Sequence, residues 1–102
     1  MSSSRANALS QILKIDKQIT QASRSAKYRK IQKYASALSG KIGSAIVVVE
    51  DPKNMGDLIR VRRNSARAKE YLASYESLLK DYENMFEKLN TLKKSYTKEL
   101  FE

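Results

Sequence analysis

The sequence predicts a mainly α protein with two short N-terminal helices, a short β-hairpin and one long C-terminal coiled-coil helix. Three observations lead to this fold class. Apolar residues recur every three or four positions over most of the chain, a β-branched run stands in the middle, and a dense turn signal follows that run. A chain of 102 residues forms one small domain with a modest core.

The N-terminal segment carries two apolar stripes at helical spacing. The first consists of Ile12, Ile15, Ile19, Ala22 and Ala26, and the second of Ile31, Ala35, Leu38 and Ile42. In one straight helix the two stripes would lie roughly 150° apart. Ser23-Arg24-Ser25 separates them and contains residues suited to capping, so we expect one helix on each side. The alternative is a single long helix that contacts two partners.

The middle of the chain has the pattern of a β-hairpin. Gly40 and Gly43 indicate the end of the second helix, because glycine costs about 1 kcal/mol in a helix interior. The β-branched residues 46–49 favour a strand, residues 51–56 favour a turn, and residues 58–62 alternate as a half-buried strand does. The competing interpretation is an all-α antiparallel helical hairpin that bends at the proline of this turn.

The last part of the chain predicts one long helix with a heptad seam. Asn64-Ser65 can cap a helix over residues 65–100, which would be about 54 Å long. The seam consists of Leu72, Tyr75, Leu79, Tyr82, Phe86, Leu89, Tyr96 and Leu100, with a gap at Lys93. Such a seam is typical of a coiled coil and needs a partner helix. The first half offers no straight stripe of this length, so we expect a second copy to cover the seam as a homodimer interface. Cover within one chain is the alternative.

The charge of the chain is uneven. The formal net charge is +9; residues 1–49 hold nine Lys or Arg and one acid, whereas residues 50–102 hold eleven Lys or Arg and ten acids. This asymmetry favours a basic binding region over residues 1–63 and a dimerisation helix over residues 64–102, within one domain overall. The partner of such a basic region is acidic: nucleic acid, an anionic membrane surface or an acidic protein.

Several functional classes are disfavoured by composition. The absence of cysteine and histidine excludes disulfides, thiolate chemistry, ordinary zinc sites and imidazole catalysis. There is also no glycine-rich phosphate loop, so we expect no enzyme, no catalytic residue, no cofactor and no metal. The longest apolar run, residues 45–49, is too short for a membrane span, and the first residues contain no secretory apolar segment. We therefore expect a cytoplasmic protein.

Two basic clusters are candidate nucleic-acid-binding sites. The first comprises Arg24, Lys27, Arg29, Lys30 and Lys33, and the second comprises Arg60, Arg62 and Arg63, followed by Arg67 and Lys69. Lysine and arginine bind phosphates, and arginine also reads base edges. A helix that starts near Ser25 would present the first cluster to bases, and the strand would present Arg60 and Arg62 to the backbone or minor groove. Alternatively, these cations pair with acids of the long helix, at Glu76, Asp81 and Glu83.

The order of these elements resembles that of small winged-helix regulators. The Asp51-Pro52 turn followed by Leu58-Ile59-Arg60-Val61 is similar to the wing of the multiple-antibiotic-resistance regulator family. The resemblance implies a recognition helix at residues 25–39, a wing at 45–62 and a dimerisation helix at 65–100. The length and mid-chain turn also resemble the helical hairpins of type VII secretion. The Trp-x-Gly turn of those proteins is absent here, and Met55-Gly56 is its nearest remnant.

Together these patterns favour a non-enzymatic, dimeric DNA-binding protein, a small regulator or an architectural protein, that uses a basic helix and a hairpin. We expect DNA rather than RNA as the nucleic acid. The alternative is a helical-hairpin module that binds an acidic or helical protein as an adaptor, chaperone or secretion-system partner. Residues 45–62 discriminate between the two, because strands favour DNA binding and a continuous helix favours the protein-interaction module.

Overall fold

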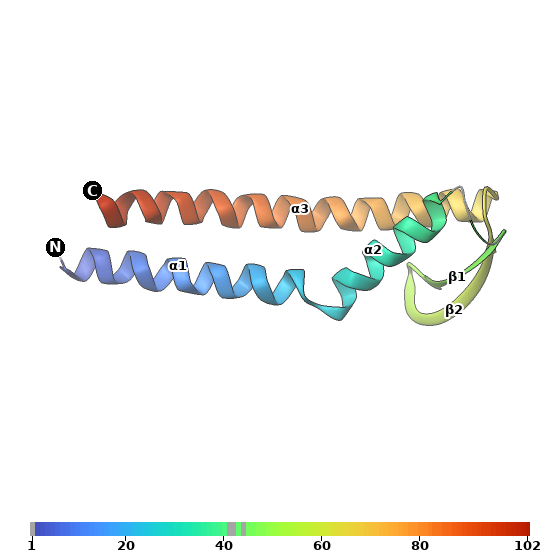
Figure 1. The fold of residues 1–102 in the computed structure, drawn as a ribbon, viewed down its shortest axis with the longest axis horizontal. Helices are drawn as coiled ribbons and strands as arrows, with labels where there is room; N and C mark the ends of the chain where they lie inside the picture. Colours follow the sequence, from blue (N-terminus) through green and yellow to red (C-terminus); the bar gives the residue numbers. More distant parts are fainter. Residues whose placement is uncertain (1, 41–42, 44) are drawn as a thin grey trace. The chain divides into compact units, whose positions relative to one another are not determined.

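The computed structural model describes residues 2–40, 43 and 45–102. Within them the element order is α1 (Ser2–Ser23), α2 (Ala26–Ser39), β1 (Ile46–Asp51), β2 (Asn54–Arg62) and α3 (Ala66–Phe101), as Figure 1 shows. The two strands form an antiparallel sheet. The predicted fold class is therefore confirmed, and the all-α alternative is wrong because residues 46–62 form strands.

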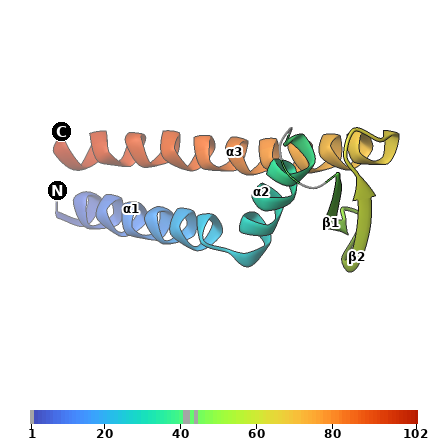
Figure 2. The same cartoon turned by 45° about the vertical axis from the view of Figure 1, so that its right-hand side comes forward.

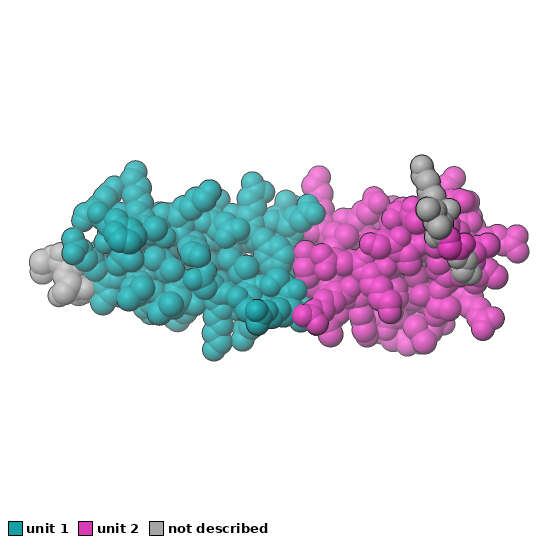
Figure 3. Space-filling view, viewed as in Figure 1, with its two compact units in different colours: residues 1–25, 82–102 teal, residues 26–81 magenta. Residues whose placement is uncertain are grey.

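The chain divides into two compact units, coloured separately in Figure 3. Unit 1 comprises residues 1–25 and 82–102, and unit 2 comprises residues 26–81. The long helix α3 contributes to both units, so the division runs through this helix rather than between the hairpin and the helix. Each unit is described by itself below.

The helix break lies at the predicted serines. α1 ends at Ser23 and α2 begins at Ala26. The Ser25 hydroxyl donates a 2.8 Å hydrogen bond to the carbonyl of Ala22, one of the groups that a helix end leaves without a partner. Ala26, expected on the first stripe, is the exposed first residue of α2 instead, and Ile42 lies outside the described residues.

Unit 1 is an antiparallel pair made by α1 and the second half of α3, which lie side by side in Figures 1 and 2. The Ser4 hydroxyl donates a 3.1 Å hydrogen bond to Glu99, which pairs the start of α1 with the end of α3. Further along, Lys93 lies 2.6 Å from the carboxylate of Asp16. The gap in the heptad seam is thus occupied by an ion pair between the two helices.

The seam of α3 is covered within the single chain. Its eight residues are all buried or half-buried: Leu72, Tyr75, Leu79, Tyr82, Phe86, Leu89, Tyr96 and Leu100. In unit 1 the buried Ala8 and Ile15 belong to α1, and in unit 2 the ring of Tyr34 lies 5.6 Å from that of Tyr75. This arrangement agrees with the alternative of cover within one chain, and the homodimer interface stays a prediction. The break after α1 gives the chain two shorter helices, and each covers one part of α3.

Unit 2 consists of α2, the hairpin and the first half of α3. β1 lies between α2 and β2 (Figure 2). The register pairs Val47 with Val61 and Val49 with Ile59 on the inner face of the hairpin. The core residues that are almost fully buried come from every element of the unit: Ile31, Leu38, Val49, Val61, Ala68 and Tyr75. The sheet is thus half-buried, as the alternation in β2 predicts.

The connection between the strands is tighter than predicted. β1 extends to Asp51 and β2 begins at Asn54, so only two residues lie between them. The Asp51 carboxylate accepts a 2.9 Å hydrogen bond from the backbone N–H of Lys53, an Asx-type contact that favours the turn. The register shifts between Glu50 and Asp51, because Glu50 pairs with Leu58 and Asp51 pairs with Asn54. The residues of β2 between these two pairs have no partner on β1, and one of them, Gly56, adopts a φ of 128°. The expected six-residue turn is therefore a short turn followed by a bulge.

The start of α3 is capped as predicted. The Ser65 hydroxyl accepts a 3.1 Å hydrogen bond from the backbone N–H of Ala68, as an N-cap residue does. Asn64 precedes it with a φ of 66°, a left-handed conformation that asparagine tolerates. This cap fixes the direction in which α3 leaves the hairpin.

The cover of α3 by α1 can be tested with a matched pair of variants. Ile15 is 3% exposed and Leu13 is 60% exposed on the same helix. We expect Ile15→Ala to lower the free energy of unfolding by about 2–4 kcal/mol, because it leaves a cavity in unit 1. Leu13→Ala should change it by less than about 0.5 kcal/mol. Urea unfolding followed by circular dichroism measures both values.

The same experiment decides between cover within the chain and cover by a second copy. Unfolding of a chain that covers its own seam has a midpoint that is independent of protein concentration. A midpoint that rises with concentration would show that the seam depends on a second copy.

Candidate nucleic-acid interface

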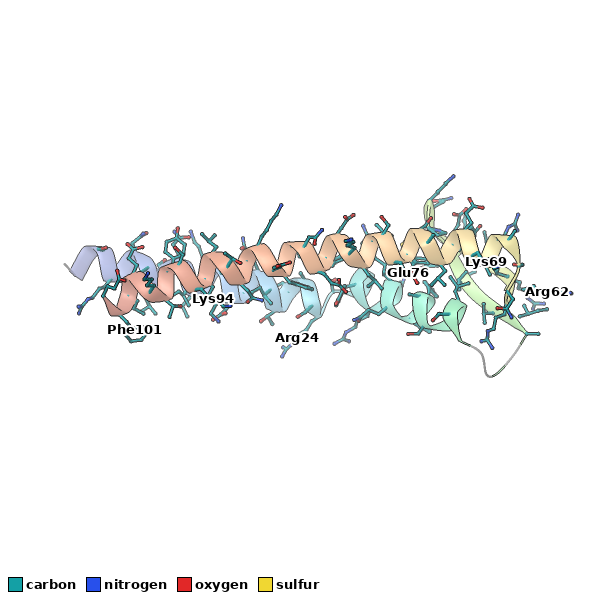
Figure 4. All side chains as sticks on the ribbon, turned by 90° about the horizontal axis from the view of Figure 1, so that it is seen from above. Arg24, Arg62, Lys69, Glu76, Lys94 and Phe101 are labelled. Carbon is teal, nitrogen blue, oxygen red and sulfur yellow. The ribbon has the colours of Figure 1, made fainter. Side chains whose placement is uncertain are left out.

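The structure separates the eight predicted cations into groups with different surroundings. Seven of them belong to unit 2, and Arg24 lies in the turn that follows α1 in unit 1 (Figure 4). Residues 26–81 contain twelve Lys or Arg and six Asp or Glu, so unit 2 holds most of the positive charge of the chain. The surroundings of each cation decide which are available to a ligand.

Arg29 and Lys33 form an exposed stripe on α2. They are four residues apart and therefore neighbours on the helix surface. The opposite face of α2 buries Ile31, Ala35 and Leu38. Neither cation has an ion pair within the described residues. The stripe can therefore contact phosphates without first breaking a contact inside the protein.

Lys30 is held by a buried acid of the hairpin. Its ammonium lies 3.3 Å from a carboxylate oxygen of Glu50, a residue that is only 6% exposed. The Tyr75 hydroxyl donates a short hydrogen bond to the backbone carbonyl of Glu50, and the Tyr34 side chain is hydrogen-bonded to the Glu50 carboxylate. Glu50 thus connects β1 to α2 and α3. Lys30 acts as the counter-ion of this cluster and is less available to a ligand than its sequence position indicates.

Burial in this cluster raises the pKa values of both tyrosines. Burial raises the pKa of Tyr75 to about 12, and the nearby negative charge of Glu50 adds to the rise. The pKa of Tyr34 is also raised, first by burial and then by the Glu50 carboxylate. Since a neutral phenol is needed to donate a hydrogen bond, the raised pKa of Tyr75 extends the pH range of its hydrogen bond beyond the ordinary tyrosine pKa of 10.0.

Lys27 lines a pocket beside the same cluster. The pocket has a volume of about 400 Å³ and is bordered by Lys27, Lys30, Glu50, Pro52, Met55, Gly56 and Leu78. The second oxygen of the Glu50 carboxylate is buried and has no hydrogen-bond partner. Because water does not reach this oxygen, a ligand in the pocket would contact the two lysines rather than the acid.

Arg63 has a structural contact at the end of α2. Its guanidinium donates a 3.4 Å hydrogen bond to the carbonyl of Ala37, in the last turn of the helix. A cation at a helix C-terminus is favourable because the helix dipole places partial negative charge there. Arg63 therefore joins the end of β2 to α2, and this contact competes with any contact to a ligand.

Arg60 and Arg62 lie on the outer face of the hairpin. The register pairs Arg60 with Val48 and Arg62 with Ile46, and all four residues are exposed. The side chain of Arg62 extends away from α3 at the end of β2 (Figure 4). Neither arginine has an ion pair among the residues that the structure describes. These two guanidinium groups are available, in contrast to that of Arg63.

In unit 2 the basic clusters do not form ion pairs with the described acids of the long helix. Glu76 and Asp81 are exposed, and no ion pair in the described part of the chain involves them. The acid that does pair with the first cluster is Glu50, which lies on the hairpin. Sequence reasoning missed Glu50 because its burial follows from the irregular end of β1, where two successive residues, Val49 and Glu50, are both buried.

The exposed aliphatic residues on the outer face of the hairpin were also missed. Val48 is 53% exposed and Leu58 is 68% exposed. A signal for them was present, since residues 46–49 are all aliphatic and a strand alternates its side chains between two faces. In a two-stranded sheet covered on one face, half of such a run has to face outward.

Comparisons with known proteins add no family to this description. No protein-family model, no curated protein and no solved structure matched the chain. Among the described residues, no helix is both long enough and apolar enough to span a bilayer. The same residues contain no group of three or more acidic, cysteine or histidine side chains that could hold a metal ion.

The division of the cations predicts that substitutions of two neighbouring residues lower stability by different amounts. Lys30→Ala leaves the buried Glu50 carboxylate without its cation, and we expect a loss of about 1–2 kcal/mol in the free energy of unfolding, reduced by the partial exposure of Lys30. Arg29→Ala should change this energy by less than about 0.5 kcal/mol. Urea unfolding at neutral pH measures both. Equal losses would contradict the assignment of Lys30 to the cluster.

Tyr75 predicts a pH dependence of stability. Its pKa is about 12 in the folded chain and 10.0 ordinarily. A raised pKa contributes stability that is complete below the ordinary value and is lost as the pH rises through the folded value. The free energy of unfolding should therefore fall more steeply between pH 10 and 12 in the natural protein than in Tyr75→Phe. Parallel curves from urea unfolding at each pH would disprove this role.

Proposed function

We propose that the chain is a non-catalytic DNA-binding protein that contacts duplex DNA with the basic surface of unit 2. The observation that carries the proposal is a set of four exposed cations of unit 2, two on α2 and two on β2, none of which has an ion pair among the described residues: Arg29, Lys33, Arg60 and Arg62. We call this set the basic surface. Unpaired surface cations attract a polyanion and release its condensed counter-ions.

The arrangement of the elements supports the proposal. α2 presents Arg29 and Lys33, and the hairpin presents Arg60 and Arg62; β1 separates α2 from β2 (Figure 2). Lys30 and Arg63 hold the two elements together through Glu50 and Ala37. Lys30 and Arg63 therefore have structural contacts within unit 2, whereas the four residues of the basic surface, and Lys27 beside the pocket, are exposed.

The hairpin favours DNA binding over the protein-interaction module, since that module was expected to be helical through residues 45–62. Leu13 on α1 and Leu92 on α3 are exposed leucines of unit 1 that a protein partner could contact.

Salt dependence and a charge-matched control test the proposal. Fluorescence anisotropy with a labelled duplex measures the dissociation constant over a range of salt concentrations. We expect the logarithm of the association constant to fall linearly with the logarithm of salt concentration. Replacement of the four residues of the basic surface by Gln should lower the steepness by about 0.9 for each lost phosphate contact.

The control removes four exposed lysines of unit 1 by the same change to Gln: Lys14, Lys17, Lys88 and Lys94. It alters the net charge equally and should retain most of the affinity. Equal losses in the two variants would mean that only total charge matters. Absence of binding at low salt would disprove the proposed function.

A further inference from the structure

The outer face of the hairpin combines arginines with exposed aliphatic residues, and the proposed function does not yet account for the aliphatic ones. Val48 and Leu58 are 53% and 68% exposed; Val48 lies directly across from Arg60, and Leu58 lies across from Glu50, whose side chain is buried. Ile46 lies across from Arg62 and is also exposed. Large exposed aliphatic side chains that adjoin one another commonly mark a binding surface.

We propose that this face enters the major groove of duplex DNA, with Arg60 and Arg62 reading guanines and Val48 and Leu58 contacting thymine methyl groups. The major groove is wide enough, about 12 Å, for a two-stranded ribbon. It is also the groove that displays both the guanine acceptors preferred by arginine and the apolar methyl group of thymine. One face that carries arginines and branched aliphatic residues matches this mixed chemistry.

The spacing of the ribbon fits that of the bases. Arg60 and Arg62 are two residues apart on β2, which corresponds to about 7 Å along a strand. Stacked bases repeat at about 3.4 Å along each strand of the duplex, so the two arginines are two base steps apart. Both guanidinium groups can therefore meet base edges at once when the ribbon follows the groove.

The contacts of α2 support this division of roles. A recognition helix reads bases from its first turns. In α2 one cation of these turns, Lys30, is paired with Glu50, whereas Lys27 is exposed beside the neighbouring pocket. The remaining stripe of Arg29 and Lys33 suits phosphates, which make no demand on sequence. The hairpin thus reads bases and the helix positions the protein, the reverse of the roles expected from sequence.

This inference rests on the proposed function, and modified duplexes separate the two. Binding is measured for an alternating A·T duplex and the same duplex with uracil in place of thymine, which lacks the methyl group. A G·C duplex is compared with one that contains 7-deazaguanine, which lacks the N7 acceptor of the major groove. A third G·C duplex carries inosine, which lacks the amino group of the minor groove.

We expect uracil and 7-deazaguanine to weaken binding of the natural chain by about fivefold or more each, and inosine to leave it within about twofold. A duplex RNA of equal length should bind more weakly, because the A-form major groove is too narrow for side chains. Val48→Ser with Leu58→Ser should abolish the difference between thymine and uracil and keep that between guanine and 7-deazaguanine. Arg60→Gln with Arg62→Gln should do the opposite.

The aliphatic substitutions lie on an exposed face, so circular dichroism and the urea midpoint establish that the variants fold. Leu13→Ser, at the exposed leucine of unit 1, is the matched control and should bind every duplex as the natural chain does. Equal affinity for all modified duplexes would overturn the inference while leaving phosphate binding intact. Sensitivity to inosine alone would place the protein in the minor groove and overturn it too. Unchanged binding by the Val48 and Leu58 variant would show that these residues serve another partner.

Discussion

The contacts of Glu50 hold the hairpin of unit 2 to both neighbouring helices. Its backbone carbonyl accepts a hydrogen bond from Tyr75 of α3, and its carboxylate lies 3.3 Å from the ammonium of Lys30 of α2. An isolated two-stranded hairpin is marginally stable in water, so its position depends on such contacts. A buried carboxylate is stable only while its partners remain in place. The position of the outer face of the hairpin therefore depends on the contacts that Glu50 makes with α2 and α3.

The same contacts explain why adjacent cations of similar chemistry have different roles. Lys30 neutralises a buried acid and Arg63 bonds to the end of α2, whereas Arg29 and Arg60 are exposed and lack an ion pair within the described residues. In sequence, all four belong to the same two clusters. Charge density alone predicts that a basic surface exists, and the burial of its neighbours determines which of its members can meet a ligand.

The local patterns of this sequence predict local structure well and tertiary partners poorly. The break beside Ser23, the strand beginning at Ile46 and the cap at Ser65 depend on neighbouring residues, and the structure confirms all three. The pairing of Lys30 with Glu50 and the cover of α3 by α1 depend on how distant segments meet, so no local pattern indicated them. The aliphatic outer face was predictable in principle, because a run of four aliphatic residues exceeds what one face of a strand can bury.

The two units that share the long helix α3 differ in the length of chain that must close for each to fold. Every contact of unit 2 joins segments within residues 26–81, whereas unit 1 has to bring residues 1–25 to residues 82–102. Closing the longer loop costs more chain entropy and slows folding. Unit 2 should therefore form first and leave the end of α3 as a nascent helix without a companion until α1 arrives. During synthesis α1 emerges from the ribosome before α3 and lacks its partner helix until residues 82–102 have been made.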